Sequence, residues 1–273
     1  MPVLTRWIND FAGLFYPNLC LACAERQPPR KALICSSCRL KLPRTDQHEY
    51  LENAFTGRFW GRAPIYSAAA MFHFVKGGRT QQLLLQLKYG GKPEIGVLLG
   101  EWYGRELRDA PGFHSVQAIV PVPLHPRKER MRGYNQSDAF ARGLARTMQA
   151  PWYKNGLRRR IFTETQTKKG RLERFGNVEE VFEVGEPEKL SGKHILLVDD
   201  VITTGATLEA CTHVLFTLPD VKVSLATIAM ASRMPGNAIR MSTSQTMAVS
   251  SQPPTYPAAS PRSVPATTAR PTA

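Results

Sequence analysis

The chain has 273 residues, of which 42% are hydrophobic, enough for one or two domains with a buried core. Its formal net charge of +14 favours polyanionic partners such as nucleic acids, nucleotides, phosphate esters or an anionic membrane surface. No stretch of about 18 apolar residues occurs, and Arg6 and Asp10 interrupt the apolar amino end, so we expect neither a membrane span nor a signal peptide.

Two Cys-x2-Cys pairs separated by eleven residues mark the amino-terminal lobe: Cys20, Cys23, Cys35 and Cys38. Four thiolates at this spacing satisfy tetrahedral Zn²⁺ and leave no open position, so we predict a structural zinc site that stabilises residues 1–45. The alternatives are two reduced pairs or a disulfide, and the cytoplasm, which we expect as the compartment, disfavours a disulfide. His48 is a further candidate ligand, whereas Cys211 is expected to be a small buried residue.

From about residue 62 to residue 233, strand-like and helix-like segments alternate. Strands are expected at 68–75, 117–122, 193–198 and 222–230. Helices are expected at 80–87, 94–107, 135–148 and 206–218. Strands separated by helices of 10–15 residues are typical of a parallel sheet covered on both faces, so the predicted fold class is α/β.

Lys88 follows an apolar helical segment and precedes Tyr89, Gly90 and Gly91. A lysine beside two glycines can approach an anion with both its ammonium group and its backbone. The alternative is a helix C-cap with glycine in the left-handed conformation, and the two interpretations are compatible.

Val-Pro-Val-Pro at 120–123 ends the second strand, and a basic loop is expected to follow. Arg132, Asn135 and Gln136 then stand where the amino end of a helix could meet a ligand. Residues 121–175 contain 14 Lys and Arg against 4 Asp and Glu. This excess indicates either a solvated basic face or a groove for a substrate or nucleic acid.

Two segments fall outside these elements. Residues 163–178 form a long polar insertion, of a kind that often acts as a lid. Residues 235–273 hold 7 Pro and 12 Ser or Thr and no acid, so they bury too little surface to offset chain entropy. We expect a disordered tail there, and a frameshifted carboxyl terminus is the alternative.

The apolar strand Ile195–Val198 leads into two acids, Asp199 and Asp200, and then into a short loop that opens a helix. The loop consists of Thr203, Thr204, Gly205, Ala206 and Thr207. Its hydroxyls, flexible glycine and unpaired helix N–H groups are the parts needed to hold a phosphate. Because carboxylates repel phosphate, the acids suit a neighbouring polyol or a metal ion that bridges to it. The alternative is an ordinary strand end in which an acid caps the helix.

This run resembles the phosphoribosyl pyrophosphate loop of the type I phosphoribosyltransferases. In that family the paired acids contact the ribose hydroxyls, commonly with Mg²⁺, and the loop holds the 5′-phosphate. The resemblance implies that Asp199 and Asp200 bind ribose and metal and that residues 203–207 bind the 5′-phosphate. It further implies that Lys88 and Arg132 bind the pyrophosphate.

Over residues 20–233 the chain resembles the ComF family, in which a zinc-binding lobe precedes a phosphoribosyltransferase domain. The resemblance rests on the four cysteines, on Val120-Pro121-Val122-Pro123 with Arg132-Gly133-Tyr134-Asn135-Gln136, on Thr163-x2-Gln166 leading to Arg174-x2-Asn177 and Phe182, and on Val198–Thr207. The chain departs from the family at Lys169, where an apolar residue is commoner, and in its tail. The polar insertion also looks like the flexible loop of glutamine amidophosphoribosyltransferases, which implies a lid containing Gln166, Arg171 and Arg174.

Several ComF members are linked to competence and to the handling of single-stranded DNA. The resemblance therefore implies a phosphoribosyltransferase-like domain at 62–233, with phosphoribosyl pyrophosphate, single-stranded DNA and competence-machinery proteins as partners. Three functions stay open: a phosphoribosyltransferase, a nucleic-acid-handling protein, and a sensor that binds phosphoribosyl pyrophosphate without turnover. No residue pattern identifies the acceptor.

Overall fold

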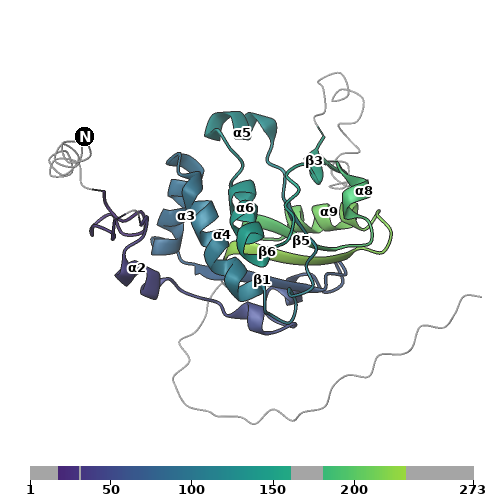
Figure 1. Ribbon diagram of the computed structural model, residues 1–273, viewed down its shortest axis with the longest axis horizontal. Coiled ribbons are helices and arrows are strands. Elements are labelled where there is room, and N and C mark those ends of the chain that lie inside the picture. Colours follow the sequence, from purple (N-terminus) through teal and green to yellow (C-terminus); the bar gives the residue numbers. More distant parts are fainter. Residues whose placement is uncertain (1–17, 31, 161–180, 232–273) are drawn as a thin grey trace, which may run out of the picture. The chain divides into compact units, whose positions relative to one another are not determined.

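The computed structural model describes residues 18–30, 32–160 and 181–231 (Figure 1). Contacts between Cα atoms divide the chain into two units, Met1–Arg233 and Met234–Ala273, and every described element belongs to the first. The expected lid residues Gln166, Arg171 and Arg174 lie outside the described residues, and so does the tail expected at 235–273.

Four parallel strands form the central sheet in the order β1-β6-β5-β2. Their bounds are β1 Ser67–Phe74, β2 Ala118–Pro121, β5 His194–Ile202 and β6 Lys222–Ala231. In β5, Ile195 and Leu197 join the core on one face of the sheet, while Leu196 and Val198 join the core on the other. Burial on both faces is typical of a parallel sheet between two layers, and the predicted α/β class is confirmed.

Helices cover both faces of this sheet (Figure 1). One layer contains α3 Arg79–Tyr89, α4 Pro93–Leu107 and α6 Gln136–Met148. The other contains α8 Pro187–Leu190 and α9 Ala206–Leu215. Within residues 18–30, 32–160 and 181–231, every helix is too short or too polar to cross a lipid bilayer.

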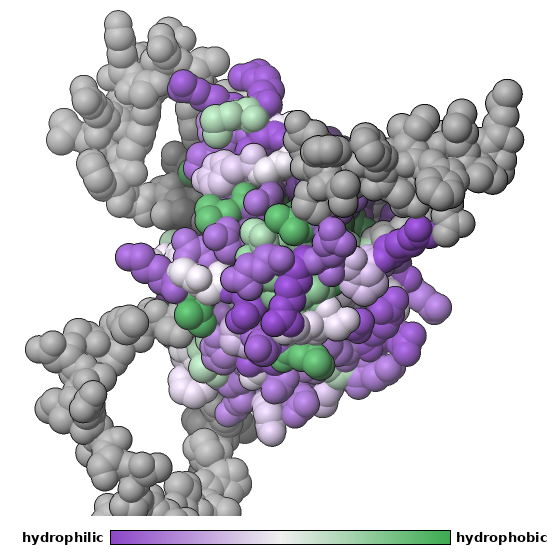
Figure 2. Space-filling model, turned by 90° about the vertical axis from the view of Figure 1, so that its left-hand side faces the viewer, coloured by the Kyte–Doolittle hydropathy of each residue, from purple (hydrophilic) through white to green (hydrophobic). Residues whose placement is uncertain are grey.

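The cysteine-bearing segment packs on the α3–α4 layer. Its helix α2, Ser36–Lys41, is flanked by Ile34 and Leu42, which share the core of α3 and α4. The guanidinium of Arg39 lies 4.6 Å from the ring centroid of Trp102 on α4. On this side of the molecule the visible surface is mostly hydrophilic, with small separate hydrophobic patches (Figure 2). Ile34 and Leu42 thus belong to a core that the segment shares with the sheet, whereas Leu40 is exposed.

Helix α5, Pro126–Arg132, replaces the basic loop that the sequence predicted after β2. Proline at the start of the helix is compatible with its geometry, and His125 Nδ1 accepts a hydrogen bond from Arg127 N at 3.1 Å. Gly133 ends the helix in the left-handed conformation, with φ of +81°. None of its residues is buried, so caps rather than a packed face define this helix.

The remaining elements are short and were not predicted. They are the 3₁₀ helices η1 Gln47–Glu49 and η2 Thr56–Arg58, and the antiparallel strands β3 Leu157–Arg159 and β4 Phe182–Val184. Strands of three residues are too short to show an alternating pattern.

Helices α4 and α6 approach each other through glycines. A Cβ atom at Gly100 or at Gly143 would lie 2.8 Å from the Cα of the other glycine. Gly143→Ala is therefore expected to lower the free energy of unfolding by about 1–3 kcal/mol, because the two backbones must move apart. Urea unfolding measures the loss, with Gly57→Ala as the control because a Cβ at Gly57 meets nothing within 4 Å. Equal losses in the two variants would contradict this packing.

Candidate functional site

Asp199 and Asp200 lie inside β5 rather than after it. The strand continues to Ile202, and Asp199 pairs with Thr227 of β6 in the parallel register. The end predicted at residue 198 was wrong because pairing with β6 carries the strand past the two charged residues. Sheet hydrogen bonds therefore fix the acids at the carboxyl edge, where open α/β sheets place their ligand crevice.

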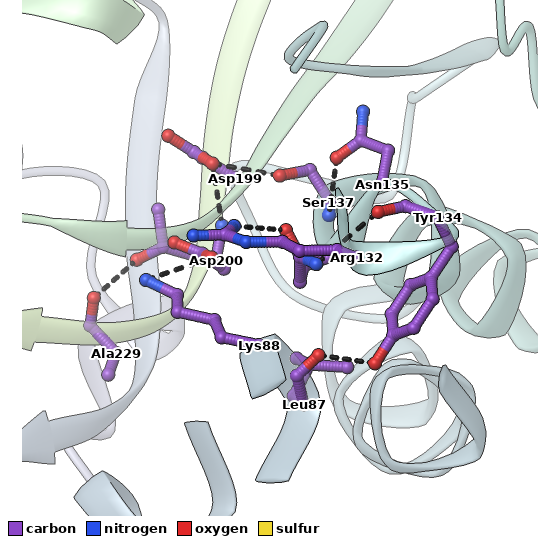
Figure 3. A network of polar contacts seen from close by, with 11 residues as sticks. Leu87, Lys88, Arg132, Tyr134, Asn135, Ser137, Asp199, Asp200 and Ala229 are labelled. Carbon is purple, nitrogen blue, oxygen red and sulfur yellow. Dashed lines mark hydrogen bonds and ion pairs between the residues drawn. The ribbon is translucent and has the colours of Figure 1, made fainter. Parts of the chain in front are cut away.

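Asp200 forms an ion pair with Lys88, whose Nζ lies 3.0 Å from Asp200 Oδ2 (Figure 3). The side chains are 14% and 25% exposed, respectively. Lys88 is in the last turn of α3, so an element distant in sequence brings a cation to the acid pair.

The segment after Lys88 forms the predicted helix cap. Gly90 N donates to Gln86 O at 2.9 Å, and the left-handed residue is Gly91, with φ of +64°. The segment joins α3 to α4, so Lys88 lies between two helices and not in a loop that follows a strand. Buried Leu83 and Leu87 keep the chain helical up to Tyr89.

Asp199 accepts two hydrogen bonds, from Ser137 Oγ and from Asp200 N, each at 2.8 Å (Figure 3). Burial and the neighbouring charge of Asp200 raise the pKa of Asp199 to about 7, against the opposing effects of Ser137 and Lys88. Near neutral pH the Asp199 carboxyl is therefore only partly ionised, and a bound cation would displace its proton.

The amino end of α6 supports the acid pair. Asn135 caps the helix, because its Oδ1 accepts from Ser137 N at 3.1 Å while its Nδ2 donates to Val122 O at 2.9 Å. Asn135 and Gln136 are buried. These two residues, which were predicted to contact a ligand, are therefore part of the packed amino end of α6.

Arg132 ends α5 beside the same helix end. Its Nη1 donates to Gln136 Oε1 at 2.7 Å, and its guanidinium lies 5.3 Å from the ring centroid of Tyr89. Among the described residues, its Nε is buried and has no hydrogen-bond partner. The hydroxyl of Tyr134 donates to Leu87 O, which ties α3 to the same region (Figure 3).

Of the five residues of the expected phosphate loop, Thr203, Thr204 and Gly205 connect β5 to α9, and the other two begin α9. Gly205 takes the left-handed conformation, with φ of +86°, and precedes the first helical residue, Ala206. The other four residues are exposed, whereas Gly205 is buried. The first N–H groups of a helix have no partner within the helix, so this turn presents donors at the carboxyl edge.

Two arginines that the sequence analysis did not select hold this loop. Arg58 Nη1 donates to Thr203 O at 2.6 Å, and Arg62 Nη1 donates to Thr204 O at 3.0 Å. Arg62 also forms an ion pair with Glu209 on α9. The loop therefore offers an anion its N–H groups and hydroxyls, because these two carbonyls already have donors.

A sequence signal for these arginines exists, although it is weak. Phe55 and Phe59, like Arg58 and Arg62, are four residues apart, a spacing that places each pair on one side of a helical turn. Ser137 was also missed, because a serine in the first turn of a helix usually indicates no more than a cap.

The sulfur atoms of Cys20, Cys23, Cys35 and Cys38 all lie within 4.8 Å of one another. Cys35 N donates to Cys20 Sγ at 3.2 Å, and Cys38 N donates to Cys35 Sγ at 3.4 Å. All cysteines in the described ranges are free, which is the arrangement that a metal site needs. These four residues could bind a metal such as zinc.

His48, the further candidate ligand, is not part of this cluster. His48 Nε2 is 3.9 Å from Glu106 Oε2, and its ring packs edge-on against Tyr103. Cys211 on α9 is buried, as expected.

Comparison with known proteins identifies relatives but no matching protein-family profile. The chain is 33% identical over 129 residues to the DNA utilization protein YhgH of Escherichia coli K12, covering 46% of this chain and 56% of YhgH. It is 34% identical over 113 residues to Competence protein F of Haemophilus influenzae, covering 40% and 49%. The chain thus spans about half the length of these two relatives.

A longer match is with Competence protein ComFC of Bacillus subtilis, which is 31% identical in an alignment of 226 positions that covers 73% of this chain. Among solved structures, the allosteric regulatory enzyme of purine biosynthesis shares 17% identity, with a TM-score of 0.37, over 52% of this chain and 29% of that one. That structural likeness is too low to support a conclusion. The match with ComFC, however, extends over 89% of that protein, and the chain belongs to the ComF family.

Proposed function

We propose that the carboxyl edge of the sheet binds phosphoribosyl pyrophosphate together with Mg²⁺. The observation that supports this most strongly is the order of groups along one stretch of chain. Two adjacent carboxylates in β5 are followed by an exposed, helix-opening turn whose carbonyls are bonded to Arg58 and Arg62. A sugar phosphate needs the same order, with acceptors for its hydroxyls beside donors for its phosphate.

The two ends of the ligand would meet different groups. Residues 203–207 would hold the 5′-phosphate, and Asp199 and Asp200 would hold the ribose hydroxyls and Mg²⁺, which prefers hard oxygen ligands. Lys88 and Arg132 would bind the pyrophosphate. The ion pair of Lys88 with Asp200 and the unpartnered Nε of Arg132 support this assignment, because both cations are already held at the site.

As an enzyme, the protein would transfer the phosphoribosyl group to an acceptor. A nitrogen lone pair of the acceptor would form a bond to C1 while the C1–O bond breaks and pyrophosphate leaves with that electron pair. The residues of the site would contribute by positioning the ligand and by neutralising the leaving group, with no covalent intermediate on the protein. Mg²⁺, when bound, would neutralise pyrophosphate oxygens.

Calorimetric titration with Mg²⁺ and phosphoribosyl pyrophosphate tests the binding step. We expect saturable binding that weakens when Mg²⁺ is omitted and when ribose 5-phosphate replaces the full ligand. Absence of binding under all three conditions would contradict the proposal. Release of pyrophosphate in the presence of a panel of bases and amines then distinguishes a transferase from a sensor.

We also propose that the cysteine cluster holds zinc and stabilises a lobe of residues 1–45. Protein purified without chelators is expected to contain one zinc ion per chain, measured by atomic emission. Cys23→Ser should lose most of it, whereas Cys211→Ala should retain it because that thiol lies on α9, away from the cluster. Metal-free wild-type protein would contradict the proposal.

A second candidate function, nucleic-acid binding, is favoured by helix α5. This helix buries none of its residues and carries Arg127, Lys128 and Arg130. The relatives named for DNA utilization and competence are consistent with a nucleic-acid ligand. We propose that the exposed cations of α5 contact the phosphates of single-stranded DNA.

Replacing these three residues together by alanine should weaken single-strand binding and lower its salt dependence. Loss of three phosphate contacts reduces the slope of log K against log salt by about 2. Fluorescence anisotropy at several salt concentrations measures this change. The control variant replaces Arg108, Arg146 and Lys189, which form ion pairs on the surface, by alanine and so removes the same charge. An equal change in slope for both triples would contradict a specific role of α5.

A further inference from the structure

Helix α3 connects the cysteine cluster to the acid pair. At its amino end Arg79 Nε donates to Cys38 Sγ at 3.3 Å, and at its carboxyl end Lys88 lies 3.0 Å from Asp200. Arg79 and Lys88 are nine positions apart, so their Cα atoms are about 14 Å apart along the helix axis. Buried Leu83 and Leu87 belong to the same core as the cysteine-bearing segment.

We propose that Arg79 is an outer-sphere ligand of the metal at the cysteine cluster, and that α3 makes the position of Lys88 depend on that metal. The part concerning Lys88 as a ligand-binding residue rests on the proposed function. The part concerning Arg79 is independent of it.

The charge of the cluster is the first argument. Four thiolates around Zn²⁺ carry two net negative charges, and three of the four cysteines are buried, so a nearby cation lowers the cost of holding the charge. Arg79 supplies both the charge and an N–H donor directed at sulfur. Arg39 follows Cys38 in the chain but lies over Trp102 instead.

The attachment of the other helix end is the second argument. Leu87 O accepts from the Tyr134 hydroxyl, and Tyr89 lies beneath the Arg132 guanidinium. Lys88 stands between these two contacts, so a shift of α3 along the sheet would change its distance from Asp200. The contact at Cys38 and these contacts hold opposite ends of one helix in place.

Zinc affinity, measured by competition with a chromogenic chelator on the full chain, tests the role of Arg79. Arg79→Met is expected to lower zinc affinity by about 10- to 100-fold, the usual range for loss of an outer-sphere partner. Arg79→Lys keeps the positive charge, and Arg79→Gln keeps an N–H donor without the charge. The zinc affinities of both variants should therefore lie between those of Arg79→Met and the wild type. Arg39→Met is the matched control and should bind zinc as the wild type does. Equal affinities for Arg79→Met and Arg39→Met would overturn this role.

The reactivity of Lys88 toward an acetylating reagent, followed by mass spectrometry, tests the effect on the other end of α3. Removing the metal from the full chain should raise the acetylation rate of Lys88 several-fold relative to Lys92, which lies just beyond α3. Zinc-saturated Arg79→Met should show an intermediate rate. An unchanged ratio would overturn the coupling. A common rise of both rates would also overturn it, because the whole fold would then depend on the metal.

Neither measurement uses phosphoribosyl pyrophosphate, so its failure to bind would reject the proposed function without deciding this inference. If phosphoribosyl pyrophosphate does bind, removing zinc from the cysteine cluster should weaken the affinity of the wild type for it. Lys88→Met, whose affinity is already weakened, should lose no more when the zinc is removed. Equal weakening in both proteins would mean that the metal acts on the site by a route other than Lys88.

Discussion

Replacing Asp200 by alanine is expected to abolish binding of Mg²⁺ and phosphoribosyl pyrophosphate while the fold stays intact. The carboxylate stands at the carboxyl edge of the sheet, where it would accept hydrogen bonds from the ribose hydroxyls and contribute an oxygen to the metal. Hydrogen bonds to a charged group contribute about 1.5–3 kcal/mol each, so the loss of two lowers affinity by at least about 100-fold. Titration calorimetry against the wild type measures this loss.

The backbone of β5 does not depend on this side chain, because parallel pairing with β6 and β2 holds the strand. The urea midpoint of Asp200→Ala should therefore stay near that of wild type. Asp200→Asn, which keeps the shape and removes the charge, should lose binding as well. Asp109→Asn is the control, because that exposed acid pairs only with its neighbour Arg108 among the contacts described. Wild-type affinity in Asp200→Ala would reject the site assignment.

The main elements of the fold could be predicted because their sequence patterns are long and buried. The apolar run 195–198 has the pattern of a central parallel strand, and Gly205 marks the turn into α9. Helix α5 could not be predicted by periodicity, because it buries no residue and so has no apolar stripe. Pro126 and Gly133 are its signals, and they act only at its two ends.

Site residues that are consecutive in the sequence were predicted. Site residues that the fold brings together from distant parts of the chain were missed. The acid pair and the loop are adjacent in sequence, so one motif contains both. Arg58 and Arg62 reach the loop across about 140 residues of chain, and no local pattern indicates which carbonyl an arginine will bind. The acids themselves were placed outside the strand, because propensity disfavours charge in a buried strand, a rule that functional sites often break.

Asp199→Asn is expected to stabilise the protein considerably more at pH 8 than at pH 5. The folded pKa of Asp199 is about 7, above its ordinary value of 3.8, so between these values the folded chain binds one proton more than the unfolded chain. Stability from this group is therefore full below about pH 4 and is lost as pH rises to 7, by up to about 4 kcal/mol. Asparagine resembles the neutral acid at every pH, and its Oδ1 can accept the same hydrogen bonds from Ser137 and Asp200 N.

Urea unfolding of both proteins at pH 5 and pH 8 measures this effect as a difference between the two curves. His194 titrates in the opposite sense, because burial and the charge of Lys222 lower its pKa to about 4, so it reduces stability as pH falls below 6.5. Its contribution is common to both proteins and cancels in the difference. A difference that is the same at both pH values would mean that the Asp199 carboxyl of the folded protein is already ionised at pH 5. A difference that grows toward pH 8 would show that this protein gives up stability to keep two adjacent acids at a site where a cation or a diol can use them.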